Sequence, residues 1–304
     1  MATNPTGYSP VARTAGAVEV QLDGAHPGFA DPQYRARRNA IATLSVDHCP
    51  GQPIPAVDYT DVEHEVWRTV ARELKPKHER LAATAFLHGA EDLGLPEDHI
   101  PQLGEVTARL RALTRFHYEP VAGLAPLRTF YQAFTDRTFF STQYIRHHSV
   151  PLYTPEPDIV HEVIGHANQL ANPVFADLYA EVGLAVLRTE TDEALRLLSK
   201  VFWFTLEFGV MWEGSELKAY GAGILSSFGE LDAFRSADIR PLDVAEIGAR
   251  TYDITRYQPV LYAAHSPAHL LDTLHDFFGR YDDEVHARVL RQVSRLDQAA
   301  SARR

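Results

Sequence analysis

Residues 157–166 read Pro157-Asp158-Ile159-Val160-His161-Glu162-Val163-Ile164-Gly165-His166, so two imidazoles and a carboxylate stand within six positions of an otherwise apolar segment. The histidines are five positions apart, whereas the zinc-hydrolase pattern H-E-x-x-H spaces them by four on one helix face. Five steps along an ideal helix separate two side chains by about 140°. Both histidines can therefore bind one ion only if the helix is locally distorted or if one of them lies at its end, and the neighbouring Gly165 would ease either arrangement.

A third candidate ligand is Glu207, the single ionisable residue in the apolar run 201–212. Burial of an unpaired carboxylate is costly, so Glu207 needs a raised pKa, an arginine or a metal beside it. A metal would satisfy all three groups at once. Two neutral imidazoles and one carboxylate from a separate element form the facial triad of non-haem Fe(II) oxygenases. This makes His161, His166 and Glu207 the candidate iron ligands.

Two other interpretations remain open at this stage. A histidine on a half-apolar helix is often a core residue whose ring is hydrogen-bonded to a backbone carbonyl. A zinc-dependent hydrolase would use Glu162 as its general base, but the five-residue spacing opposes it. Iron with oxygenase chemistry is the first hypothesis, and zinc hydrolysis is the second.

Composition limits the partners of the chain. Its 304 residues are 45% hydrophobic, which is ample for a proper core. The formal net charge of −11 disfavours nucleic acid and anionic membranes as partners. Cys49 is the only cysteine, which suits a reducing cytoplasm. Residues 1–16 lack an apolar signal region, and no stretch reaches the roughly 18 apolar residues of a membrane span. We expect a soluble, cytoplasmic enzyme without a membrane anchor.

Patterning predicts a flexible N-terminal arm over residues 1–25 and a catalytic domain over residues 26–304. A capping-box pattern at residues 60–63 opens a helix that Pro76 should end or kink. Further helices are expected over residues 77–93, 104–113, 158–170, 173–187, 191–211, 243–250 and 283–299, with another beginning at Ser266-Pro267. Short strands are expected over residues 139–145, 216–220 and 259–263. The fold class is mainly α, a single domain with small β pieces.

Several long blocks of sequence point to one family. They are His26-Pro27-Gly28-Phe29, Tyr34-Arg35-Ala36-Arg37-Arg38, Gly51-Gln52-Pro53-Ile54-Pro55, Pro120-Val121-Ala122-Gly123, Thr142-Gln143-Tyr144-Ile145-Arg146-His147, residues 153–166, Trp203-Phe204-Thr205, Lys218-Ala219-Tyr220-Gly221-Ala222-Gly223 and Ser226-Ser227-Phe228-Gly229-Glu230. From His26 to about Phe278 the chain resembles the catalytic domain of the pterin-dependent aromatic amino acid hydroxylases, most closely the branch that acts on phenylalanine. The resemblance implies that family's fold, with Fe(II) and a tetrahydropterin as cofactors.

The resemblance also assigns roles to particular residues. Its iron ligands fall on His161, His166 and Glu207, the trio chosen above on physical grounds. The carboxylate of the amino acid substrate would be held by Arg146, Thr154 and Ser226, and its ring by Trp203, Phe208, Gly223 and Ile254. The pterin site corresponds to Val121, Gly123, Leu124, Phe130 and Glu162. Glu162 and Trp203 are the residues expected to take part in catalysis beside the metal.

The implied reaction is the hydroxylation of L-phenylalanine to L-tyrosine with O2. Tyrosine hydroxylases carry an acid where this chain has Ile254, and the bulky Trp203 would crowd an indole substrate. A tryptophan or other aromatic amino acid hydroxylase of the same family is the alternative. Departures occur at Ala167-Asn168-Gln169, which replaces an apolar, proline-containing stretch, and at Ala125 and Leu127 of the pterin loop. We expect a monomer that binds no nucleic acid and no membrane.

Overall fold

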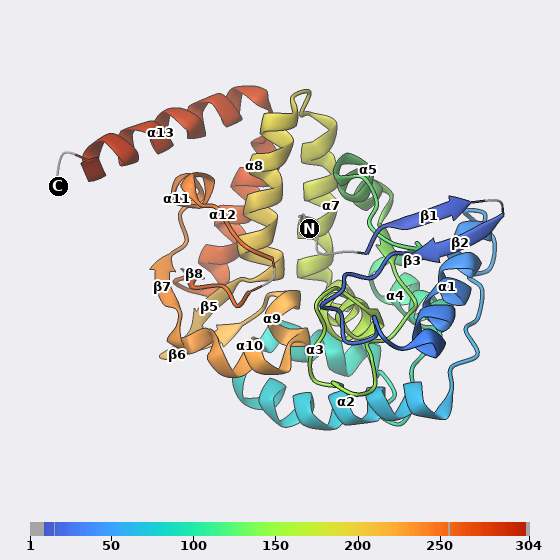
Figure 1. The fold of residues 1–304 in the computed structure, drawn as a ribbon. Helices are drawn as coiled ribbons and strands as arrows, with labels where there is room; N and C mark the ends of the chain where they lie inside the picture. Colours follow the sequence, from blue (N-terminus) through green and yellow to red (C-terminus); the bar gives the residue numbers. More distant parts are fainter. Residues whose placement is uncertain (1–8, 15, 255, 302–304) are drawn as a thin grey trace.

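The computed structural model describes residues 9–14, 16–254 and 256–301. Two helices, α7 (Pro173–Leu187) and α8 (Asp192–Phe202), stand side by side at the centre, and α2 (Asp61–Leu81) lies across one end of the molecule (Figure 1). One large cluster of buried apolar side chains joins these helices, with Trp67, Phe175 and Leu198 among its members. The prediction of a mainly α domain with small β pieces is confirmed.

Local signals account for most helix starts. Thr60 and Glu63 form the expected capping box at the start of α2. The helix continues past Pro76 to Leu81, because its buried face supplies core contacts on both sides of the proline, from Leu74 and from Leu81. Helices α3 (Thr84–Leu93) and α4 (Leu103–Thr114) follow.

The β structure consists of small sheets. Strands β3 (His117–Pro120) and β4 (Thr138–Ser141) pair in parallel, and a four-stranded sheet has the order β6-β5-β8-β7. Its strands are β5 (Val210–Glu213), β6 (Glu216–Ala219), β7 (Asp238–Pro241) and β8 (Val260–Ala264). The helix expected over residues 191–211 therefore ends earlier than predicted, since residues 210–213 pair with β6 and β8.

The N-terminal segment differs from the expected mobile arm. Strands β1 (Val11–Thr14) and β2 (Ala17–Val20) form an antiparallel hairpin. Alternate side chains, Val18 and Val20, are buried against Ala42 of α1 (Pro32–Asp47). The alternation has a period of two, but it is too short to stand out from an Ala- and Gly-rich background. Residues 1–8 of the expected arm lie outside the described residues.

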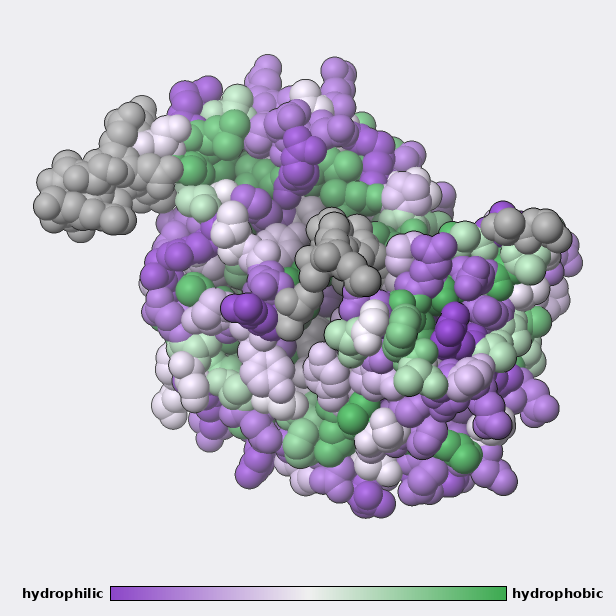
Figure 2. All heavy atoms as spheres, in the orientation of Figure 1, coloured by the Kyte–Doolittle hydropathy of each residue, from purple (hydrophilic) through white to green (hydrophobic). Residues whose placement is uncertain are grey.

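The remaining elements connect and cover this frame. They are α5 (Leu127–Ala133), a 3-10 turn (Phe134–Asp136), α6 (Asn168–Ala171), α9 (Ala222–Ser226), α10 (Phe228–Ala233), a 3-10 turn (Phe234–Ser236), α11 (Val244–Ala249), α12 (Pro267–Arg280) and α13 (Asp283–Ser301). Hydrophilic side chains dominate the face shown in Figure 2, with smaller apolar areas between them. Among the described helices, none alone has the length and apolarity to cross a membrane, and one pair bent by 103° meets those criteria by length and composition only.

Close contact between α3 and α6 depends on Gly89. A Cβ at this position would lie 2.1 Å from the Asn168 carbonyl oxygen. We expect Gly89→Ala to lower the free energy of unfolding by about 1–3 kcal/mol or more, the range for overpacked sites. The matched control is Gly104→Ala in α4, where a Cβ meets nothing within 4 Å. Urea unfolding should show the control within about 1 kcal/mol of wild type, and equal stability of both variants would contradict the packing argument.

Candidate metal centre and its surroundings

The two histidines lie on a distorted helix, as their spacing requires. Residues His161–Ala167 form a π-helix, whose hydrogen bonds run from residue i to i+5. This wider turn brings side chains five apart onto one side. Gly165 has a second role, because a Cβ there would lie 2.8 Å from the Ala222 carbonyl oxygen and push α9 away.

Glu207 lies at the end of a second π-helix, Trp203–Glu207, that continues directly from α8. The Phe208 N–H donates to the Trp203 carbonyl, which closes this wider turn. Gly209 and Gly221 then allow the chain to fold back tightly, since a Cβ on Gly221 would lie 2.3 Å from the Glu207 carbonyl oxygen. Two unusual turns thus face each other across one site.

The three candidate ligands converge on one point. His166 Nε2 lies 3.0 Å from His161 Nε2 and 3.0 Å from Glu207 Oε1, and His161 Nε2 lies 3.8 Å from Glu207 Oε2. Bonds of about 2.1 Å to one ion place neighbouring ligand atoms about 3.0 Å apart at right angles and about 3.4 Å apart in a tetrahedron. The donor set and its spacing therefore fit a single metal ion.

The outer partners of the two rings place a proton on Nδ1 of both His161 and His166. The Tyr179 hydroxyl donates to Gln169 Oε1 at 2.5 Å and so accepts from His166 Nδ1 at 2.8 Å. The Ser226 hydroxyl donates to the Ala222 carbonyl at 2.8 Å and so accepts from His161 Nδ1 at 2.9 Å. Both Nε2 atoms are thus turned toward the site, which is how metal-ligating histidines are oriented in proteins.

Electrostatics favours a cation in this position. Burial, reinforced by the charge of the neighbouring His166, lowers the pKa of His161 to about 4, so its ring is neutral at pH 7. Burial alone would raise the pKa of Glu207, but His166 reverses this and the pKa is lowered. The charge that lowers the pKa of Glu207 belongs to a protonated His166, whose Nε2 then donates to Glu207 Oε1 at 3.0 Å. A bound metal ion would replace that proton and supply the same compensating positive charge.

Glu162 is a further acid at the centre. Its carboxylate lies within 4.8 Å of ligand atoms of both His161 and His166, and the side chain is buried. The backbone carbonyl of Glu162 accepts a 2.6 Å hydrogen bond from Tyr118, which fixes this part of the π-helix. Glu162 therefore lies beside the two histidines that are the candidate ligands.

Arg146 is buried rather than exposed. Its Nε and Nη2 donate to the two oxygens of Asp158 at 2.9 and 2.8 Å, a bidentate pair. Asp158 Oδ1 also accepts from the His161 backbone N–H at 3.3 Å. Arg146 is thus tied to the start of the first π-helix, and Ser226 reaches the same helix through His161. Thr154 lies four residues before Asp158, and its hydroxyl donates to the Glu156 carbonyl at 2.6 Å.

An aromatic wall stands next to Glu207. The rings of Trp203 and Phe208 have centroids 4.5 Å apart, and Trp203 stacks on Tyr252 at 4.6 Å. Gly223 makes room for Phe208, because a Cβ would lie 2.6 Å from that ring. Ile254 is half-buried two positions after Tyr252. The sequence did not single out Tyr252, since no periodic pattern marks the loop that carries it.

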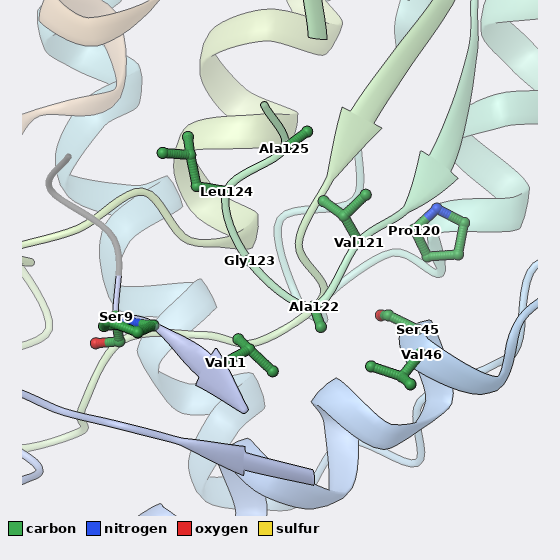
Figure 3. Close-up of a pocket in the computed structure, with 11 residues that line it drawn as sticks. Ser9, Val11, Ser45, Val46, Pro120, Val121, Ala122, Gly123, Leu124 and Ala125 are labelled. Atoms are coloured by element: carbon green, nitrogen blue, oxygen red, sulfur yellow. The ribbon is translucent and has the colours of Figure 1, made fainter. Parts of the chain in front are cut away.

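The residues expected to bind the pterin fall into two groups. Val121, Gly123 and Leu124 line a cavity of about 510 Å³ between the loop after β3 and the N-terminal hairpin (Figure 3). Phe130 instead packs on Phe139 at 5.5 Å, and Phe139 lies 4.6 Å from the His166 ring. Phe130 and Glu162 therefore belong to the metal side, and the lining of the cavity includes neither of them.

A buried ionic cluster anchors the segment that follows Arg146. Glu156 accepts from Arg38 at 2.7 Å and from the Ser9 backbone N–H at 2.7 Å, and His26 lies 3.5 Å away. The Arg38 guanidinium lies 3.3 Å from the centroid of the Tyr144 ring. Burial alone would raise the pKa of Glu156, but the hydrogen bond from His26 and the charge of Arg38 lower it to about 2.

Two residues in the hydrogen-bond chain behind His166 Nδ1 are not marked by any sequence pattern. Tyr179 lies on the apolar α7, where an aromatic is ordinary core. Gln169 was visible only as a departure from the family pattern. Its amide nitrogen donates to the Leu206 carbonyl at 3.0 Å and to the Tyr220 carbonyl, so it connects both π-helices.

Removal of the Tyr179 hydroxyl should weaken metal binding. We expect Tyr179→Phe to lower the affinity for Fe(II) about 10–100-fold, the usual cost of losing a partner of a ligating histidine. The measurement is an anaerobic Fe(II) titration. The control is Tyr131→Phe, because the Tyr131 hydroxyl contacts Ser199 and neither histidine. An unchanged affinity in Tyr179→Phe would show that this hydrogen bond does not position His166.

The Glu156 cluster predicts an acid-dependent stability. The folded pKa of about 2 lies below the ordinary 4.5, so the stabilisation is complete above pH 4.5 and is lost as the pH falls through 2. This shift corresponds to about 3 kcal/mol. Glu156→Gln should be less stable than wild type at pH 7, and the difference should narrow as the pH falls below 4.5. A difference that stays constant between pH 7 and pH 3 would contradict the assignment.

Comparison with known proteins gives the family. The model of the biopterin-dependent aromatic amino acid hydroxylases matches residues 10–293. A phenylalanine 3-hydroxylase from Streptomyces coeruleorubidus is 46% identical over 90% of this chain and 98% of its own length. The phenylalanine-4-hydroxylase of Bos taurus is 45% identical over 81% of this chain and 56% of its own length. The chain thus spans about half the length of this animal relative.

Solved structures agree with this result. Apo phenylalanine hydroxylase from Colwellia psychrerythraea superimposes with a TM-score of 0.72 at 28% identity, over 82% of this chain and 94% of that one. The enzyme from Chromobacterium violaceum with bound iron(III) and 7,8-dihydrobiopterin gives a TM-score of 0.71 at 28% identity, over 78% of this chain and 89% of that one. The chain belongs to the iron-containing, biopterin-dependent aromatic amino acid hydroxylases.

Proposed function

We propose that this chain hydroxylates the aromatic ring of L-phenylalanine with O2 and a tetrahydropterin, at an iron ion held by His161, His166 and Glu207. The observation that carries the proposal is the convergence of these three ligand atoms, at 3.0 to 3.8 Å from one another, in a chain of this family. The zinc-hydrolase alternative loses its support, because the family uses iron and biopterin.

The residues around the candidate metal ligands have separate roles in this reaction. Bound iron and pterin together supply the activation of O2, which no side chain can perform. Trp203 and Phe208 form an apolar wall that orients the substrate ring and keeps water away. The bidentate pair with Asp158 orients the Arg146 guanidinium. Its remaining N–H groups bind the substrate carboxylate. Glu162 borders the side on which the pterin is expected.

Phenylalanine is preferred over other ring substrates for two reasons. Ile254 offers an alkyl group where a ring hydroxyl would need a polar partner. Trp203 is fixed by stacking on Tyr252 and by a 3.3 Å hydrogen bond from its Nε1 to Gln258 Oε1. A fixed indole cannot swing aside for the larger ring of tryptophan.

The ring carbon that is attacked separates two candidate products. The family resemblance implies the para carbon and therefore L-tyrosine. The relative from Streptomyces coeruleorubidus is named a phenylalanine 3-hydroxylase and shares 46% identity with this chain. This relation makes meta-tyrosine the second candidate. We also propose that the protein works as a cytoplasmic monomer without nucleic-acid or membrane partners.

Product identification tests the proposal. Protein reconstituted anaerobically with Fe(II) is supplied with tetrahydrobiopterin, O2 and each aromatic amino acid in turn. We expect phenylalanine to be the best substrate and tyrosine the product; meta-tyrosine would establish the second candidate. Glu207→Gln and His161→Ala should lose iron and turnover, whereas His99→Ala, an exposed histidine, should retain both. Full iron content in Glu207→Gln, or no ring hydroxylation in wild type, would refute the proposal.

A further inference from the structure

A second group of metal-ligating side chains lies outside the site described above. Among the described residues, Asp31, His147 and His148 each offer a ligand atom, and these atoms lie within 4.8 Å of one another. We propose that this group is a binding site for a divalent cation of the Zn²⁺ class. Two imidazole nitrogens and one carboxylate oxygen, with a position left for water, form a donor set that zinc accepts.

Asp31 is already oriented for this role. It is the N-cap of α1, where Oδ1 accepts from the backbone N–H groups of Gln33 at 2.8 Å and Tyr34 at 3.1 Å. These bonds fix the carboxylate and leave Oδ2 directed at His147 Nε2, 3.2 Å away. This separation is close to the roughly 3.4 Å between ligand atoms of a tetrahedral ion with 2.1 Å bonds.

His147 is held from its other side. Its Nδ1 lies 2.8 Å from the Ser149 hydroxyl and 3.3 Å from the Ser149 backbone nitrogen. Without a cation, Nε2 carries the ring proton and donates it to Asp31. In this state Nδ1 accepts from the Ser149 backbone N–H. With a cation on Nε2, the proton would move to Nδ1, where the Ser149 hydroxyl would accept it in place of that long backbone bond. A serine hydroxyl also lies next to Nδ1 of His161 in the candidate metal centre, and hydrogen-bond partners at this nitrogen are typical of ligating histidines.

His148 completes the set from the solvent side. Its ring centroid lies 4.3 Å from that of His147, and the side chain is exposed, so it can turn toward a cation without disturbing the core. His148 also lines a cavity of about 360 Å³ that includes Asp61 and Glu65 in its wall. These two acids raise the local concentration of cations next to His148.

A cation here would join two segments that are far apart in sequence. Asp31 begins α1, whereas His147 directly follows Arg146 and precedes the segment that carries Thr154 and Asp158. The link would therefore restrain the backbone next to Arg146. The inference rests on Asp31, His147 and His148 alone and holds whichever amino acid the enzyme hydroxylates.

The test uses iron-loaded protein titrated with ZnCl2 by calorimetry, followed by desalting and metal analysis for both iron and zinc. We expect wild type to keep its iron and gain one equivalent of zinc. His148→Ala should bind this zinc at least tenfold more weakly with unchanged iron. Asp31→Asn should do the same, since asparagine preserves the helix cap and removes the charge. Zinc should also raise the Tm of wild type more than that of His148→Ala.

The matched control is His99→Ala, an exposed histidine whose Nδ1 lies 2.7 Å from Asp98 without a second histidine ligand. It should take up zinc as wild type does. Equal zinc affinity in His148→Ala and wild type would overturn the proposal. So would zinc that binds only as iron is lost, because the ion would then occupy the catalytic centre. In both cases Asp31 and His147 would form an ordinary ion pair.

Discussion

The convergence of two imidazole nitrogens and one carboxylate on a single buried point is the constraint on which the site depends. The outer partners hold a proton on Nδ1 of each ring, so both Nε2 atoms turn toward Glu207. Such an arrangement is stable only where the surrounding structure holds each group firmly. The buried hydroxyl of Tyr179, the hydroxyl of Ser226 and the packed α9 supply this rigidity.

Two π-helical turns of the backbone bring the three candidate ligands together. Regular α-helices would direct His161 and His166 away from each other, so the wider turn at His161–Ala167 is part of the ligand geometry. The turn at Trp203–Glu207 places Glu207 opposite them and leaves Trp203 to form the aromatic wall. Glycines at 165, 209 and 221 permit the close approach of backbones that these turns require. Metal binding and substrate packing therefore share one set of backbone distortions.

Periodicity and capping signals in the sequence predict much of the fold. The capping box at Thr60, the helix over Pro173–Leu187 and the cap at Ser266 follow from local rules, and the structure confirms them. The spacing of His161 and His166 predicted a distorted helix, which the structure also contains. Local rules failed where tertiary pairing decides, as in β5, whose apolar residues continue the pattern of the preceding helix until β6 and β8 pair with them. They also missed the β1–β2 hairpin and the bond between Tyr179 and His166, because such contacts join residues that no short pattern relates.

The Gln169 side chain has a consequence for how the centre behaves when its ion is absent. One amide contacts the Tyr179 hydroxyl, the carbonyl of Leu206 and the carbonyl of Tyr220, so both ligand-bearing turns are fastened to a single planar group. A shift of either turn alone would break at least one of these hydrogen bonds. We therefore expect the metal-free site to keep its ligand geometry. An ion could then be released and bound again without refolding of the two turns.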